Sequence, residues 1–220
     1  MADIKVHQKI LTTEGKKLLT RISQYPILEQ FHLVGGTALA LYLGHRVSID
    51  FDFFSPADFR LDIHGDLKIN PNDKLQIITN FTNSVEVILN GVKVFFWRFS
   101  YPLIKPTNTY NNIKLASLVD LALLKLLALE GRITWKDLID LYFIDKEFIS
   151  LPNLIATFKS VYPTNLTNPY SQFKVLLNEA ELEKSPKPLM LKEVDFEVAK
   201  TTVFKKLLSS FKESIFLVDN

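Results

Sequence analysis

The chain has 220 residues, of which 47% are hydrophobic and 12% aromatic, which is enough apolar material for one packed domain or two small ones. Its 26 basic and 24 acidic residues give a formal charge of +2, so overall charge does not by itself indicate a nucleic-acid partner. The absence of cysteine excludes disulfides, Cys-ligated zinc and thiol catalysis, and any metal site must use oxygen or histidine ligands.

The sequence predicts neither a signal peptide nor a membrane-spanning helix. Residues 1–30 carry scattered lysines and no continuous apolar run, so no signal peptide is predicted. The most apolar stretch, residues 115–129, is interrupted by Asp120 and Lys125, which favours a buried helix over a membrane span. We therefore expect a cytoplasmic protein without a membrane partner.

The first half of the chain predicts a sheet with a few helices. Residues 13–24 have the apolar spacing of an amphipathic helix. Residues 31–34 read as a strand that runs through Gly35 and Gly36 into a helix at 38–43, and residues 50–54 alternate acidic and aromatic side chains as a strand does.

The next segments are a loop and a hairpin. Residues 55–74 are polar and contain Pro and Gly, which predicts a loop-rich excursion. Residues 85–89 and 92–99 flank Asn90-Gly91, the dipeptide that a type I′ turn favours, and predict a β-hairpin.

From about Asn111 onward the pattern is helical. Ser117 with Asp120 and Thr134 with Asp137 read as capping boxes that open two helices. We therefore expect an α+β fold, with a mixed sheet and flanking helices in residues 1–111 followed by a helical bundle in residues 112–220. Loops are predicted at 162–170 and 185–188, and the last helix has one apolar face made by Val203, Phe204, Leu207, Leu208 and Phe211.

Asp50 and Asp52 are candidates for a metal site. Two apart on a strand, their carboxylates leave the same face, while Phe51 and Phe53 point into the core. Carboxylate pairs of this kind hold Mg²⁺ in phosphoryl and nucleotidyl transfer. The alternative is a solvated turn, where aspartates bond their own backbone.

Gly35, Gly36 and Thr37 are candidates for phosphate binding. Glycines allow the backbone to approach a ligand, the following helix offers free N–H groups, and the Thr37 hydroxyl could add a contact. A simple tight turn is the alternative.

Lys125 and Asp140 are expected to face each other across a helical hairpin. They are equidistant from the turn around Arg132 and Ile133. Because Lys125 lies among leucines, it must either reach solvent or find an anion, and Asp140 or a triphosphate would serve.

A set of motifs spread over roughly residues 30–145 is specific enough to indicate a family. The motifs are Leu33-Val34-Gly35-Gly36-Thr37-Ala38-Leu39-Ala40-Leu41, Gly44-His45-Arg46, Ser48-Ile49-Asp50-Phe51-Asp52-Phe53-Phe54, Asp120-Leu121-Ala122 through Lys125, and Arg132 with Lys136-Asp137-Leu138-Ile139-Asp140-Leu141-Tyr142. In these motifs the chain resembles the AbiEii/AbiGii toxin family of nucleotidyltransferases.

The resemblance implies the nucleotidyltransferase fold, an NTP as donor substrate, and Mg²⁺ or Mn²⁺ as cofactor. It also implies a metal site at Asp50 and Asp52, and a helical domain that completes the active-site cleft. The implied catalytic residues are Asp50, Asp52, Lys125 and Asp140, and the implied nucleotide-binding residues are Gly35, Gly36, Thr37, Arg46, Ser48 and Lys125. Arg46 could instead hold the two aspartates in place, or lie on the surface at a helix end.

The chain departs from the fold's usual pattern at one point. A third carboxylate commonly lies on a later strand, but the candidate strand at residues 92–97 has no acid. Glu86 on the partner strand and Asp140 are the alternatives, or the site has two aspartates only.

The resemblance also implies an RNA acceptor, with a tRNA 3′ end as the expected one, and a role as the toxin of a toxin–antitoxin or abortive-infection system with a helix-turn-helix antitoxin. Single-stranded RNA is bound by basic grooves with stacking aromatics. Trp97 lies close in sequence to several cations, namely Lys93, Arg98, Lys105 and Lys114. The alternative is that Trp97 belongs to the core.

Two other functions remain open. One is transfer to a protein or small-molecule acceptor, and the other is a non-catalytic module that binds an NTP or a partner.

Overall fold

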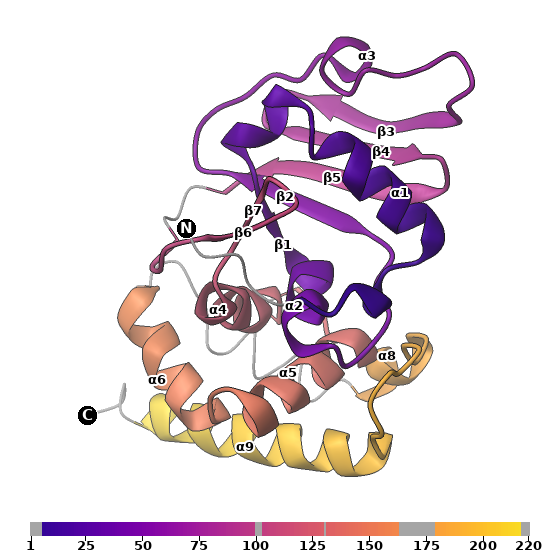
Figure 1. Cartoon of the computed structure of the whole chain (residues 1–220). Helices are drawn as coiled ribbons and strands as arrows, with labels where there is room; N and C mark the ends of the chain where they lie inside the picture. The colour runs from indigo at the N-terminus through magenta and orange to yellow at the C-terminus, as the bar shows by residue number, and fades with distance from the viewer. Residues whose placement is uncertain (1–5, 100–102, 130, 163–178, 217–220) are drawn as a thin grey trace. The chain divides into compact units, whose positions relative to one another are not determined.

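The chain forms two compact units, Met1–Leu121 and Ala122–Asn220, which are described separately below. The structure is a computed structural model that describes residues 6–99, 103–129, 131–162 and 179–216 (Figure 1). The first unit contains the β-sheet, and the described part of the second is helical.

The first unit is built on a mixed seven-stranded sheet with the strand order β3-β4-β5-β2-β1-β7-β6. The pairs β1–β7 and β2–β5 are parallel, and the remaining neighbours are antiparallel. The strands are β1 (His32–Val34), β2 (Phe51–Ser55), β3 (Leu75–Phe81), β4 (Ser84–Leu89), β5 (Val92–Arg98), β6 (Asn108–Tyr110) and β7 (Ile113–Leu115).

Side-chain alternation divides the central strands into a buried face and an open face. Phe51 and Phe53 of β2, with Val94 and Phe96 of β5, are almost completely buried. Helix α1 (Thr13–Ile22) packs on β5, and Figure 1 shows it lying along β4 and β5. The side chains between these buried residues form the open face.

Helix α1 begins at a side-chain cap, whereas α2 begins without one. Thr12 caps α1 by accepting a hydrogen bond from the Gly15 amide. Helix α2 (Gly35–Leu43) follows β1 directly, so the two glycines are its first residues and there is no separate turn. It ends at Gly44, whose φ is +63°. Short 3-10 helices, η1 (Gln8–Ile10) and η2 (Pro26–Gln30), complete this part of the unit.

The predicted hairpin is confirmed as β4 and β5. Asn90 and Gly91 both have positive φ, as a type I′ turn requires. A second hairpin, β6–β7, turns at Asn111 and Asn112, which also have positive φ. No strand was predicted here. Strand β7 pairs with β1, so the sheet continues beyond the predicted domain boundary near Asn111.

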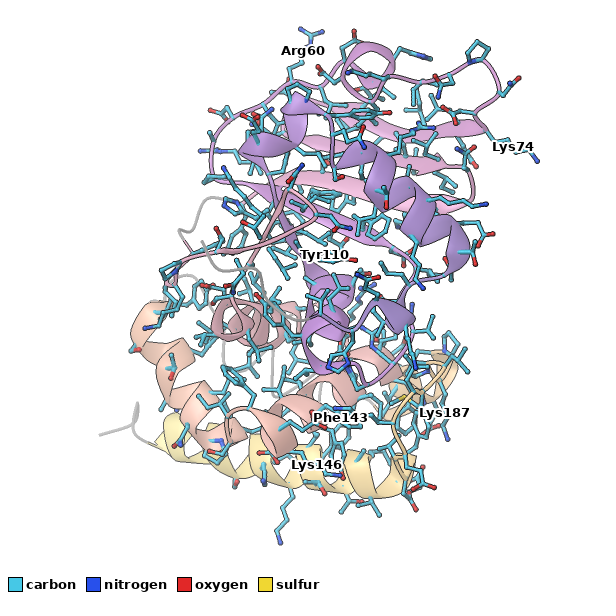
Figure 2. The ribbon with its side chains drawn as sticks, in the orientation of Figure 1. Arg60, Lys74, Tyr110, Phe143, Lys146 and Lys187 are labelled. Atoms are coloured by element: carbon cyan, nitrogen blue, oxygen red, sulfur yellow. The ribbon has the colours of Figure 1, made fainter. Side chains whose placement is uncertain are left out.

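The segment between β2 and β3 is mostly loop, as predicted, with one short helix, α3 (Ile63–Asp66). Its exposed side chains Arg60 and Lys74 project away from the chain (Figure 2). Asp73 holds the end of the segment against α1 and the β4–β5 turn. It accepts hydrogen bonds from Arg21 at 2.8 Å and from Asn90 at 2.7 Å.

The second unit is an assembly of helices. Helix α4 (Leu118–Ala128) leads into it, followed by α5 (Trp135–Glu147), α6 (Leu151–Val161), α8 (Glu179–Lys184) and α9 (Phe196–Phe216). Helix α9 packs along α5 and α6 (Figure 1). Its Val203, Phe204 and Leu207 are buried and Leu208 is half-buried, whereas the side chain of Phe211 and the loop at 163–170 lie outside the described residues.

Both predicted capping boxes are present. Ser117 accepts from the Asp120 amide at 3.1 Å, and Thr134 accepts from the Asp137 amide at 3.3 Å. Asp120 also accepts from the Ile104 amide at 2.7 Å. Among the described residues, no helix has the length and apolarity needed to cross a bilayer. The predicted α+β fold, a mixed sheet with flanking helices followed by a helical part, is therefore confirmed.

Candidate active site

Gly35 makes room for the carboxylate of Asp52. Val34, immediately before the glycine, pairs with Asp52 across the antiparallel strands β1 and β2. A Cβ atom at Gly35 would overlap the Asp52 carboxylate, and φ at this residue is +69°, which side chains rarely adopt. Glycine is therefore required here both by backbone conformation and by the neighbouring carboxylate.

Gly36 makes room for the guanidinium of Arg46. A Cβ atom at Gly36 would overlap the guanidinium of Arg46, a side chain that is only 1% exposed. Arg46 donates to the Val47 carbonyl at 3.1 Å and to the Ser48 hydroxyl at 3.4 Å. Two consecutive glycines thus seat one anionic and one cationic side chain, and the alternative of a surface position for Arg46 is wrong.

Thr37 connects α2 to the segment that carries the aspartates. Its buried hydroxyl donates to the backbone carbonyl of Asp50 and is hydrogen-bonded to the Ser48 hydroxyl at 2.8 Å. Both hydroxyls are therefore engaged within the protein, and so is Arg46. These three side chains fix the position of the backbone beside Asp50, and their direct contact with a nucleotide stays a prediction.

Asp50 and Asp52 are suited to a divalent cation. Strand β2 begins at Phe51, so Asp50 lies just before the strand and Asp52 within it. Both residues are half-buried and offer hard carboxylate oxygens next to the start of α2. Mg²⁺ usually takes one or two protein carboxylates and completes its shell with water and substrate phosphates, so a pair of aspartates fits it. We call Gly35, Gly36, Arg46, Asp50 and Asp52 the glycine–aspartate corner.

The start of α2 adds a second feature of a phosphate site. Val34, the residue before the helix, provides no side-chain cap. The first amides of a helix have no partners within the helix and attract anions. The backbone at Gly35 and Gly36 is thus a reasonable place for phosphate oxygens.

Glu86 does not join the two aspartates. It is aligned with Phe95 of β5, and Phe95 is aligned with Asp52, so one strand separates the two acids. Two strand spacings amount to ~10 Å between their backbones. Glu86 forms an ion pair with Lys93 at 2.5 Å instead. In the described part of the chain, no group of three or more His, Cys, Asp or Glu residues could hold a metal ion.

The second unit contains a buried polar cluster made by Lys125, Asp137 and Asp140. The Lys125 Nζ lies 2.8 Å from Asp140 Oδ2, which confirms that these two residues face each other. It lies 2.9 Å from Asp137 Oδ1 as well. Asp137 was expected only to cap α5; its i,i+3 spacing from Asp140 places both acids on one side of the helix, which was the signal for the wider cluster.

The three side chains of the cluster are largely buried, which affects their charge. The side chain of Asp140 is fully buried, that of Asp137 is 6% exposed, and that of Lys125 is 12% exposed. Burial by itself raises the pKa of Asp137, but the Lys125 charge and the hydrogen bonds from Thr134 and Lys125 outweigh it, so its pKa is lowered. Asp137 therefore stays ionised beside the Lys125 ammonium.

Comparison with known proteins locates the family signature in the first unit. The family model described as "Nucleotidyl transferase AbiEii toxin, Type IV TA system" matches residues 17–86, which include the whole glycine–aspartate corner. An uncharacterized protein of Aquifex aeolicus (strain VF5) is 31% identical over 137 residues, 61% of this chain. The matched region spans 66% of that relative's own length.

Solved structures with the same fold match most of the chain. JHP933 from Helicobacter pylori has a TM-score of 0.52 and 19% identity, with 97% of each chain covered. MenT4, a nucleotidyltransferase toxin from Mycobacterium tuberculosis H37Rv, has a TM-score of 0.56 and 13% identity, covering 89% of this chain and 82% of that one. The resemblance and the fold predicted from the sequence are confirmed: residues 17–86 match the AbiEii nucleotidyltransferase toxin model, and the chain has the nucleotidyltransferase fold of these solved structures.

Proposed function

We propose that this protein transfers a nucleoside monophosphate from an NTP to the 3′ end of an RNA, as the toxin of a toxin–antitoxin system. The observation that carries the proposal is the glycine–aspartate corner: two half-buried carboxylates beside the uncapped start of a helix, inside the segment that matches the AbiEii model. This combination suits a nucleotide with its metal better than a solvated turn.

In the proposed reaction, the acceptor hydroxyl oxygen forms a bond to the α-phosphorus of the NTP. The bond from the α-phosphorus to the oxygen that bridges to the β-phosphate breaks, pyrophosphate leaves, and the hydroxyl proton passes to solvent. Mg²⁺ or Mn²⁺ held by Asp50 and Asp52 would supply electrostatic stabilisation of the charge on the reacting phosphate. The amides at Gly35 and Gly36 would bind phosphate oxygens.

Arg46 of the corner and the neighbouring Thr37 have a positioning role in this proposal. Both are 1% exposed and are hydrogen-bonded within the protein. Thr37 sets the backbone of Asp50 through its carbonyl, and Arg46 fills the space behind Gly36. Each would affect transfer through the placement of the carboxylates.

Lys125 is assigned to the donor phosphates by the family resemblance. Its side chain is the most exposed of the cluster, at 12%, and its ammonium is paired with both Asp137 and Asp140. Asp140 is fully buried, so we assign it the orientation of Lys125 and not a contact with substrate.

The test is transfer of label from α-³²P NTPs, one nucleotide at a time and with Mg²⁺, to total tRNA and separately to protein. Asp52→Asn keeps the size of the side chain and removes its charge, and it should abolish labelling. Asp195→Asn is the matched control, because this exposed aspartate caps α9 and asparagine caps equally well. Label on RNA that persists in Asp52→Asn would contradict the assignment of the metal site.

The acceptor class is decided by where the label appears. Label on protein in place of RNA would replace the RNA acceptor with a protein side chain and leave the donor chemistry intact. NTP binding without labelling of any acceptor would favour a binding module.

The toxin role has its own test in cells. Expression of the wild-type chain should stop growth, whereas the Asp52→Asn chain should not. Co-expression of the neighbouring gene, expected to encode a small helix-turn-helix protein, should restore growth. Equal toxicity of wild type and Asp52→Asn would show that growth arrest does not depend on nucleotide transfer.

A further inference from the structure

Aromatic side chains form a continuous surface on the open face of the sheet. Phe54 of β2 and Phe95 and Trp97 of β5 all point away from the buried face. The ring centroids of Phe54 and Trp97 are 4.7 Å apart, and those of Phe95 and Trp97 are 5.7 Å apart. Phe99, which is buried, packs on Phe54 with the ring centroids 5.2 Å apart. Phe54, Phe95 and Trp97 are called the aromatic face.

The aromatic face adjoins the glycine–aspartate corner within the same unit. Asp52 and Phe54 are two apart on β2 and point the same way, and Phe95 is the direct neighbour of Asp52 across the parallel pair. The first ring of the surface is thus one strand spacing from the candidate metal carboxylate, which is ~5 Å between backbones.

Exposure distinguishes this surface from an ordinary core. Trp97 is 41% exposed, so the alternative that it belongs to the core is wrong. A hollow lies over this end of the strands, and the short side chain of Ser84, aligned with Trp97, contributes to its floor. The hollow is lined by Thr82, Asn83, Ser84, Phe95, Trp97 and Arg98.

Two cations of β5 flank the rings. Arg98 pairs with Asp58 at 3.2 Å, but that aspartate is 70% exposed, and exposed pairs contribute ~0–1 kcal/mol. Exchange of Asp58 for a phosphate would therefore cost little. Lys93 lies two residues before Phe95 on the same face. Stacking rings with cations along one strand are the features by which proteins bind single-stranded nucleic acid.

We infer that the aromatic face binds an unpaired base of the acceptor strand, stacked on Phe95 and Trp97, with Arg98 on its phosphate. The inference rests on the proposed function for the identity of the acceptor, and it adds the surface that positions it. Each stacked base contributes ~1–3 kcal/mol, equivalent to roughly 5- to 150-fold in affinity.

The experiment is a titration of the full chain with a labelled short oligoadenylate RNA, followed by fluorescence anisotropy. Trp97→Ala should weaken binding by at least about 5-fold, while Trp97→Phe, which keeps a ring, should restore most of it. The matched control is Phe81→Ala, which removes a more exposed ring, at 69%, from outside the hollow and should bind like wild type. The same RNA annealed into a duplex should bind more weakly than the single strand.

Binding by Trp97→Ala within twofold of wild type would overturn the inference, as would equal losses in Trp97→Ala and Phe81→Ala. Failure of the wild type to bind the oligonucleotide would also overturn it and would favour a protein on this surface. The proposed function fails separately: Asp52→Asn should bind the oligonucleotide normally, so Trp97-dependent binding without label transfer would refute the enzyme and leave the binding surface standing.

Discussion

The glycine–aspartate corner of the first unit and the Lys125 cluster of the second both bring opposite charges together, but they differ in what surrounds them. The carboxylates of the corner are half-buried, while its cation, Arg46, is buried behind Gly36. In the Lys125 cluster the two carboxylates are 0% and 6% exposed, and the cation is the most exposed member at 12%. Half-buried acids can bind a metal from solvent, whereas buried acids paired with an ammonium chiefly stabilise the fold and hold the lysine in place.

The largest effect is expected from substitution of Gly35, where both the backbone conformation and the neighbouring Asp52 carboxylate require glycine. Gly35→Ala should reduce nucleotide transfer by about 100-fold, because a methyl group displaces the Asp52 carboxylate and misplacement by ~1 Å has effects of that size. Gly91→Ala is the control, since it has a φ of +81° with nothing within 4 Å of the added atom. It should show the backbone penalty alone, ~1–2 kcal/mol of stability, with transfer unchanged. Equal activity of the two variants would mean that Gly35 serves the backbone only.

Removal of the cation from the buried cluster should reduce stability. Lys125→Met leaves Asp137 and Asp140 without a positive partner, and breaking a buried pair in this way costs about 3–5 kcal/mol. Urea unfolding at neutral pH measures this loss of unfolding free energy. Lys184→Met, which removes a 71% exposed lysine, should change the unfolding free energy little. If both variants unfold alike, the cluster contributes nothing to the fold.

A smaller effect is expected at the hydroxyl that holds Asp50. Thr37→Val keeps the shape of the side chain and removes its hydrogen bonds to the Asp50 carbonyl and to Ser48, at a cost of about 1–3 kcal/mol for a buried group. Thr157→Val, which removes an exposed hydroxyl bonded within a helix, should cost less. Thermal unfolding of the two variants provides the comparison. A Thr37→Val chain as stable as Thr157→Val would show that the Thr37 hydroxyl does not hold Asp50 in place.

The smallest effect is a pH dependence of the cluster. Because the pKa of Asp137 is lowered in the folded state, its ionised form stabilises the fold above the unfolded pKa of ~3.9, and this contribution is lost as pH falls through the folded pKa. The stability difference between wild type and Asp137→Asn should therefore be constant near neutral pH and shrink below about pH 4. Urea midpoints measured from pH 7 to pH 3 test it. If the stability difference grew on acidification, the pKa of Asp137 would be raised in the folded state and not lowered.

The parts of the structure that follow local rules could be predicted from the sequence. The Asn90-Gly91 hairpin and the capping boxes at Ser117 and Thr134 depend on a few adjacent residues. Even the Lys125–Asp140 contact followed from their equal distances to a helix turn. These features need no knowledge of distant packing.

Other features depended on contacts that no short stretch contains. Strand β3 escaped prediction because it lies at the edge of the sheet and exposes Gln76, Ile77 and Ile78 in succession, so its side chains do not alternate. The three-residue strands β6 and β7 are too short to show a period. The burial of Arg46 against Gly36 arises from tertiary packing, and an arginine in a sequence is normally read as exposed.

The most direct test of the contrast between the two regions is Mn²⁺ binding, followed by electron paramagnetic resonance in the presence of a non-hydrolysable NTP. Wild type and Asp137→Asn should both bind Mn²⁺, and Asp52→Asn should lose the site while unfolding at the wild-type temperature. Mn²⁺ binding that survives in Asp52→Asn and disappears in Asp137→Asn would contradict the assignment of the metal to the glycine–aspartate corner.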